Sequence, residues 1–99
     1  LQYKAFAMPF KASRTLFGVF EDSKGRVWVK ISTALYQFNE KTGQFKYYYG
    51  IDDVNHDSFM VESIPYEDSA GKLWLGTWFD YPRVYNPKSD SFEPTSKEK

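Results

Sequence analysis

The sequence predicts an all-β protein made of two similar four-stranded antiparallel units. Aromatic residues make up 20% of the 99 residues, and rings in this number favour strands over disordered polar segments. Residues 21–29 recur as residues 67–75, so the chain contains an internal repeat. An Asp-Ser-x-Gly turn precedes a short apolar stretch in both copies, which is the pattern of a β-hairpin.

The repeat sets the length of one unit. The two copies are offset by 46 residues and share five identities in nine positions, while flanking matches have offsets of 45 and 47. A bulge or loop insertion produces such one-residue changes, and we expect them near Pro65 and in residues 78–82. A period of this size fits a blade of four strands or a pair of helices. The apolar triplets 27–29 and 73–75 favour strands that are buried on both faces.

Each unit divides into four strands. Gly25 and Gly71 can take the positive φ that the first turn of each unit needs, and Thr42-Gly43 and Ser89-Asp90 supply the next turn. In the first unit we expect strands at 16–20, 26–31, 35–39 and 44–48, and in the second at 61–66, 72–77, 83–86 and 91–93.

The arrangement predicted for these units is two blades of a β-propeller. Residues 2–6 resemble residues 44–48, so we assign 1–10 to the last strand of a preceding blade and a connector, 11–50 to the first blade and 51–99 to the second. Each blade buries its faces against its neighbours, so two blades alone leave two apolar faces bare. We therefore expect the chain to be a segment of a larger propeller, and to self-associate when isolated.

The repeated motif resembles a known family, the two-component regulator propeller repeat. Residues 67–77 follow the family pattern, roughly E-D-S-x-G-x-L-W-I-G-T, almost letter for letter, and the Asp-rich connector 52–59 is similar to the loop between blades. Residues 30–34 and Pro82 depart from the pattern, which affects local strand ends. The first unit follows the pattern through Glu21-Asp22-Ser23, Gly25, Trp28, Leu35, Phe38-Asn39 and Thr42-Gly43-Gln44-Phe45.

The resemblance implies a periplasmic sensor region of a membrane-bound, often hybrid, histidine kinase that detects carbohydrate and regulates genes for glycan utilisation. The kinase chemistry belongs to other parts of such proteins, so none of it maps onto this chain. Two alternatives remain open. The propeller could be a scaffold for protein contacts or dimerisation without a ligand, or an enzyme such as a lyase or glycosidase, which needs converging His, Tyr and acidic residues that this sequence lacks.

Composition argues against several other functions. Thirteen basic and thirteen acidic residues cancel, so no net charge attracts nucleic acid, and no apolar run is long enough to insert into a membrane. Cysteine is absent, His56 is the sole histidine, and phosphate-loop and dinucleotide motifs are missing, so we expect no metal, no cofactor and no catalysis. The run Asp53-x-Asn55-x-Asp57 begins like a calcium loop, but it lacks the glycine and the glutamate that complete one.

Candidate site residues fall into two groups. Residues shared by both repeats are expected to build turns and packing contacts between blades: Glu21, Asp22, Gly25 and Trp28 in the first, and Glu67, Asp68, Gly71 and Trp74 in the second. Residues that differ between repeats are better candidates for a ligand, because rings beside a carboxylate and a guanidinium suit sugars. These are Trp78, Phe79, Asp80, Tyr81 and Arg83, although their rings, like those of Tyr47-Tyr48-Tyr49, could instead pack within the fold.

Overall fold

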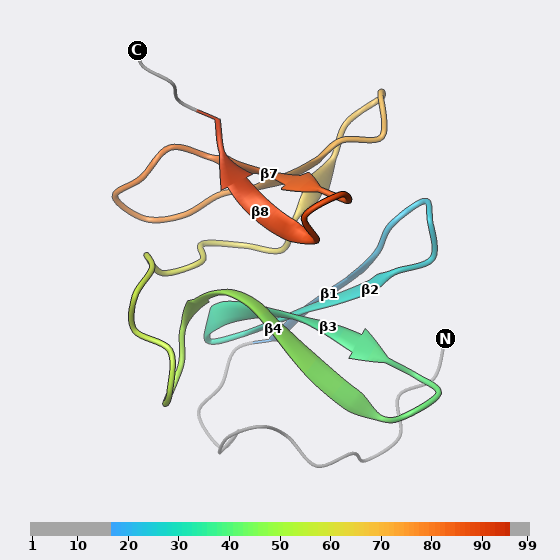
Figure 1. The fold of residues 1–99 in the computed structure, drawn as a ribbon, viewed down its shortest axis with the longest axis horizontal. Coiled ribbons are helices and arrows are strands. Elements are labelled where there is room, and N and C mark those ends of the chain that lie inside the picture. The colour runs from blue at the N-terminus through green and yellow to red at the C-terminus, as the bar shows by residue number, and fades with distance from the viewer. Residues whose placement is uncertain (1–16, 96–99) are drawn as a thin grey trace.

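The computed structural model describes residues 17–95, which form two four-stranded antiparallel sheets without a helix (Figure 1). This confirms the predicted all-β class and the two four-stranded units. The expected strand at residues 2–6 lies outside the described residues. The strands are β1 (Phe17–Glu21), β2 (Val27–Ile31), β3 (Thr33–Asn39), β4 (Gln44–Ile51), β5 (Tyr66–Glu67), β6 (Leu73–Leu75), β7 (Arg83–Asn86) and β8 (Ser91–Pro94).

The first sheet is a meander in which each strand pairs with the next, β1-β2-β3-β4. β3 begins two residues earlier than predicted because Ser32 alone, at φ 56, turns the chain between β2 and β3. β4 extends to Ile51, and its register shifts opposite Leu35 and Tyr36. The shift puts Tyr49 opposite Leu35, so Tyr49 is buried between the sheets while Tyr47 packs with the cluster on the other face.

The second sheet has the same strand order, β5-β6-β7-β8, but shorter strands. β5 covers only Tyr66–Glu67 instead of the predicted 61–66, and Val61 forms an isolated bridge with Thr77. From the Val61–Thr77 pair to the Tyr66–Trp74 pair, the segment that leads into β5 spans five positions, whereas the segment opposite it spans only three. The extra residues include Pro65, which has no N–H for the ladder. The predicted irregularity near Pro65 is therefore present.

An aspartate anchors the first turn of each unit to the tryptophan that follows it. Asp22 accepts hydrogen bonds from the backbone N–H groups of Lys24 and Arg26 and from Trp28 Nε1, each at 2.9 Å. Asp68 repeats the arrangement with Ala70, Lys72 and Trp74, again at 2.9 Å in each case. Because the same carboxylate fixes both the turn and the indole, each tryptophan is directed to the same face of its own sheet.

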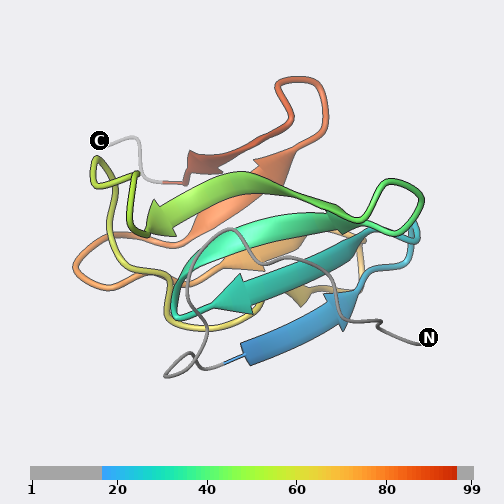
Figure 2. The ribbon, with the colours of Figure 1, turned by 90° about the horizontal axis from the view of Figure 1, so that it is seen from below.

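The two sheets stack face to face with their strands in the same order (Figure 2). Trp28 is fully buried at the centre of the interface, and its ring meets Tyr85 and Phe92 of the second sheet edge-on, with centroids 5.5 and 5.3 Å apart. Gly18 of β1 lies so close to Ile64 that a Cβ at Gly18 would collide with it. The cluster between the sheets comprises Trp28, Leu35, Tyr49, Val61, Leu73, Leu75 and Phe92.

Opposite faces of the two units meet in this interface. Leu73 and Leu75 correspond to Val27 and Val29 in the repeat, yet they face Trp28, whereas Val27 and Val29 belong to a separate cluster on the other side of the first sheet. The tryptophan face of one unit therefore covers the aliphatic face of the next. We call this the head-to-tail order. A sandwich with two-fold symmetry would instead bring the same face of each unit together.

The head-to-tail order predicts unequal costs for the two equivalent tryptophans. Trp28→Ala should lower the free energy of unfolding by about 3–5 kcal/mol, because it empties a fully buried site. Trp74→Ala should cost about half as much, since Trp74 is only partly buried. Urea denaturation followed by circular dichroism measures both, with Trp78→Ala as an exposed control. Equal losses at the two positions would contradict the head-to-tail order.

Candidate functional site

The residues that differ between the repeats form an exposed loop between β6 and β7. This loop, residues 78–82, lies at the end of the sheets opposite the tight turns at 22–26 and 68–72 (Figure 1). The exposed fractions of Trp78, Phe79 and Tyr81 are 48%, 81% and 63%. We call residues 78–81 the aromatic loop. Phe79 and Tyr81 are thus mostly exposed, and about half of Trp78 is exposed, so all three rings have surface available to a ligand.

The structure divides the predicted ligand residues into two sets. Arg83 points toward the interface between the sheets, where its guanidinium lies 4.5 Å from the Tyr49 ring centroid and donates a 3.0 Å hydrogen bond to the carbonyl of Phe92. Asp80 forms an ion pair with Arg83 at 3.5 Å. Arg83 therefore anchors the base of the loop through Asp80, and Trp78, Phe79 and Tyr81 are left to form the exposed part.

Phe79 has an unusual backbone conformation. Its φ of 64 lies in the left-handed region, which costs a non-glycine residue roughly 1–2 kcal/mol. Phe79 with Asp80 and Tyr81 lines an open hollow of about 310 Å³. A strained aromatic residue that is mostly exposed contributes little to the core, and strain of this kind often accompanies a functional site.

A second loop brings another exposed ring to the same region. The carbonyl of Met60 accepts a 2.9 Å hydrogen bond from Trp78 N, and the neighbouring Phe59 is 43% exposed. Phe59 is not among the site residues expected from the sequence. Phe59 lies near the aromatic loop because Met60 pairs with Trp78, and no short sequence pattern predicts that pairing.

Asp90, which was expected only to help form a turn, joins the two sheets. It accepts hydrogen bonds from Tyr85 at 2.6 Å, from Tyr48 of the first sheet at 2.8 Å and from Lys46 of the first sheet at 2.7 Å. Asp90 stands where the first unit has Gly43, and it keeps a positive φ of 53. The bonds from Lys46 and Tyr85 lower the pKa of Asp90 to about 2. An aspartate at a position that favours glycine was the available signal.

One of the two shared glutamates, Glu67, makes a contact between the sheets that the sequence did not predict. Glu67 Oε1 accepts a 3.0 Å hydrogen bond from the backbone N–H of Ser23, and Glu67 Oε2 accepts another from the Ser23 hydroxyl. Glu67 therefore joins the second sheet to the first turn of the first sheet. The equivalent Glu21 is exposed.

Asp22 is the buried carboxylate of the repeat, with an exposed fraction of 5%. Burial by itself raises its pKa, but hydrogen bonds from Trp28 and Arg26 outweigh that effect and hold the pKa below the ordinary value. Asp68 also has a lowered pKa, chiefly because of the hydrogen bond from Trp74. Both carboxylates are occupied by structural bonds, which is the arrangement of an anchored turn.

The connector 52–65 does not assemble a cation site. His56, Asp53 and Asp57 are exposed, and the side chain of Asn55 donates to Asp52 at 3.1 Å. Within residues 17–95, no three His, Cys, Asp or Glu side chains are arranged to hold a metal ion. The same residues include no helix of the length and apolarity that a membrane span requires.

Comparison of the chain with protein-family models, with curated proteins and with solved structures gave no match.

The position of Asp90 predicts how stability depends on pH. The folded pKa of about 2 lies below the ordinary value of about 3.9. The stabilisation is therefore fully present above about pH 5 and is lost as the pH falls toward 2. Asp90 is partly exposed, so solvent screening limits the effect to about 1 kcal/mol. Urea denaturation between pH 7 and pH 2 should show a shallower acid decline for Asp90→Asn than for the unmodified protein.

Asp22 titrates in the same direction in both proteins, so the difference between the two curves isolates Asp90. Asparagine also tolerates the positive φ, which leaves the backbone of the turn unstrained. Parallel curves for the two proteins would show that Asp90 does not stabilise the contact between the sheets.

Proposed function

We propose that this chain forms two adjoining blades of a β-propeller that senses carbohydrate in the periplasmic region of a membrane-bound histidine kinase. The kinase, the periplasmic location and the regulation of glycan utilisation rest on the resemblance of the repeated Glu-Asp-Ser…Trp motif to two-component regulator propeller repeats. The chain acts as a binding and signalling unit in this proposal, and it turns over no substrate.

The head-to-tail order supports the blade assignment. When opposite faces of successive units meet, the contact does not close after two units, and it continues until the rotation completes a ring. The contacts between the sheets join equivalent strands: Gly18 of β1 meets Ile64 just before β5, and Tyr48 of β4 binds Asp90 just before β8. Neighbouring blades of a propeller have this relation, in which one unit is carried onto the next by a rotation.

The aromatic loop is the observation that carries the binding proposal. Sugar rings present apolar C–H faces with hydroxyl edges, which suit exposed aromatic rings near groups that form hydrogen bonds. The rings of Trp78 and Phe79 have centroids 6.2 Å apart at a tilt of 44°, so they offer two surfaces at an angle. The Asp80 carboxylate belongs to the same loop and is paired with Arg83. A ligand bound at this end of the blades would alter the contact between the sheets through Arg83 and Tyr49.

The binding proposal predicts that Trp78→Ala weakens carbohydrate binding at least tenfold, because aromatic anchors in binding sites carry about 2 kcal/mol or more. A glycan array of polysaccharide fragments would identify the ligand, and calorimetry would measure its affinity. Tyr66→Ala is the matched control, since Tyr66 is 66% exposed but lies in β5, outside the aromatic loop. Equal losses for both variants, or no ligand on the array, would favour the scaffold alternative.

A second variant separates binding from folding. Phe79→Gly relieves the positive φ and removes a ring that is 81% exposed, so the free energy of unfolding should change by less than about 1 kcal/mol. Affinity for the same oligosaccharide should nevertheless fall. If Phe79→Gly destabilised the protein strongly while leaving the affinity unchanged, Phe79 would be a structural residue and not a ligand contact.

A further inference from the structure

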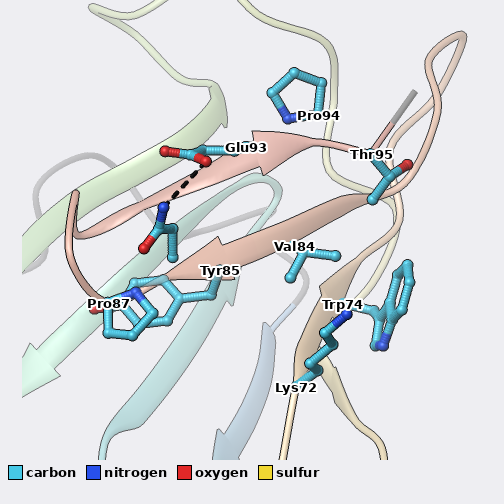
Figure 3. A pocket seen from close by; sticks show the side chains of 9 residues that line it. Lys72, Trp74, Val84, Tyr85, Pro87, Glu93, Pro94 and Thr95 are labelled. Atoms are coloured by element: carbon cyan, nitrogen blue, oxygen red, sulfur yellow. Dashed lines mark hydrogen bonds between the residues drawn. The ribbon is translucent and has the colours of Figure 1, made fainter. Parts of the chain in front are cut away.

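The outer face of the second sheet is an open counterpart of the interface already formed. Its groove, about 470 Å³ in volume, is lined by Trp74 of β6, Val84 of β7, Glu93 and Pro94 of β8 and the following Thr95 (Figure 3). Trp74 is the repeat equivalent of Trp28 and has the same bond to its aspartate. Trp28 is covered by the aliphatic face of the second sheet, whereas Trp74 is partly exposed.

A second feature of the formed interface also recurs without its partner. Ser23 donates both its backbone N–H and its hydroxyl to the two oxygens of Glu67. Ser69 is the repeat equivalent of Ser23 and is exposed, and among residues 17–95 it has no acceptor for either donor. The turn at Ser69 therefore presents the same two donors that bind a carboxylate in the other unit.

We propose that this outer face receives a further β-sheet of the same repeat, which is positioned by a carboxylate bound to Ser69. The aliphatic face of that sheet fills the groove at Trp74. The glutamate that precedes its first turn accepts hydrogen bonds from the N–H and the hydroxyl of Ser69. The shared glutamate and serine thus form a clamp that joins each unit to the one before it. This inference rests on the blade arrangement of the proposed function and is independent of carbohydrate binding.

Charge further defines the partner. Lys46 and Tyr48, which hold Asp90 in the formed interface, correspond to Glu93 and Thr95 in the second unit. An aspartate at the position of Asp90 in the incoming sheet would therefore approach Glu93 and be repelled. The favoured partner carries a basic residue there. An identical copy of the second unit would supply the glutamate that binds Ser69, but its aspartate at the position of Asp90 would be repelled by Glu93.

The test extends the full chain by one repeat, with residues 51–95 duplicated after Thr95. The duplicate carries lysine in place of the aspartate that corresponds to Asp90. Amide hydrogen exchange measured by NMR should show exchange at the Ser69 N–H slowed at least tenfold relative to the original chain. Glutamine in place of the duplicate's clamp glutamate should reverse most of that protection. The Ser23 N–H, already bonded to Glu67, serves as the internal reference in both proteins.

Retaining aspartate in the duplicate should give less protection of Ser69 than lysine does. Unchanged exchange at Ser69 beside a folded duplicate would overturn the proposal. So would a duplicate that remains unfolded by circular dichroism, because the face would then have failed to seat a sheet of this type. Glycan binding is read separately: loss of binding with Ser69 protected would retract only the sensing proposal, and binding with Ser69 unprotected would retract only the clamp.

Discussion

The hydrogen bond between an aspartate and the indole of a tryptophan six residues later determines how the rest of the structure is arranged. In each unit, one carboxylate binds the turn through two backbone N–H groups and binds the ring of the second strand. A turn held in this way has little freedom to rotate the ring toward the other face of the sheet. Both tryptophans therefore lie on the equivalent face of their own sheet, and the order is head-to-tail because the tryptophan face of the first sheet packs against the aliphatic face of the second.

The contacts between the sheets divide into a centre and two edges. At the centre, the Trp28 ring packs against Phe92 and Tyr85 with aliphatic residues around it, and this apolar burial is the main source of cohesion. Near one edge Glu67 binds Ser23, and near the other Asp90 binds Tyr48 and Lys46. These polar bonds are partly exposed, so they contribute less energy than the centre but fix which strands lie side by side. The aromatic loop is joined to this framework by the ion pair of Asp80 with Arg83 and by the bond from Trp78 N to the carbonyl of Met60.

Much of the fold could be predicted from the sequence, because the repeat placed the turns and the turns placed the strands. The anchoring of the Asp22 turn and its bond to the Trp28 indole are local consequences of one motif. What escaped prediction depends on contacts between residues far apart in the chain. Asp90 meets Tyr48 across 42 positions, and Glu67 meets Ser23 across 44, so neither partner is visible in a short segment. Arg83 was grouped with the exposed rings by sequence proximity, but strand alternation directs its side chain toward Tyr49.

The head-to-tail order is the central claim, and it can be tested by observing which aromatic rings lie next to one another in solution. Nuclear Overhauser effects in a ¹³C,¹⁵N-labelled sample, recorded at low concentration, report protons closer than about 5 Å. The head-to-tail order predicts cross-peaks from the Trp28 indole to the rings of Tyr85 and Phe92, whose centroids lie 5.5 and 5.3 Å away, and none between Trp28 and Trp74. A cross-peak between the two tryptophans would mean that like faces meet, and would contradict the head-to-tail order.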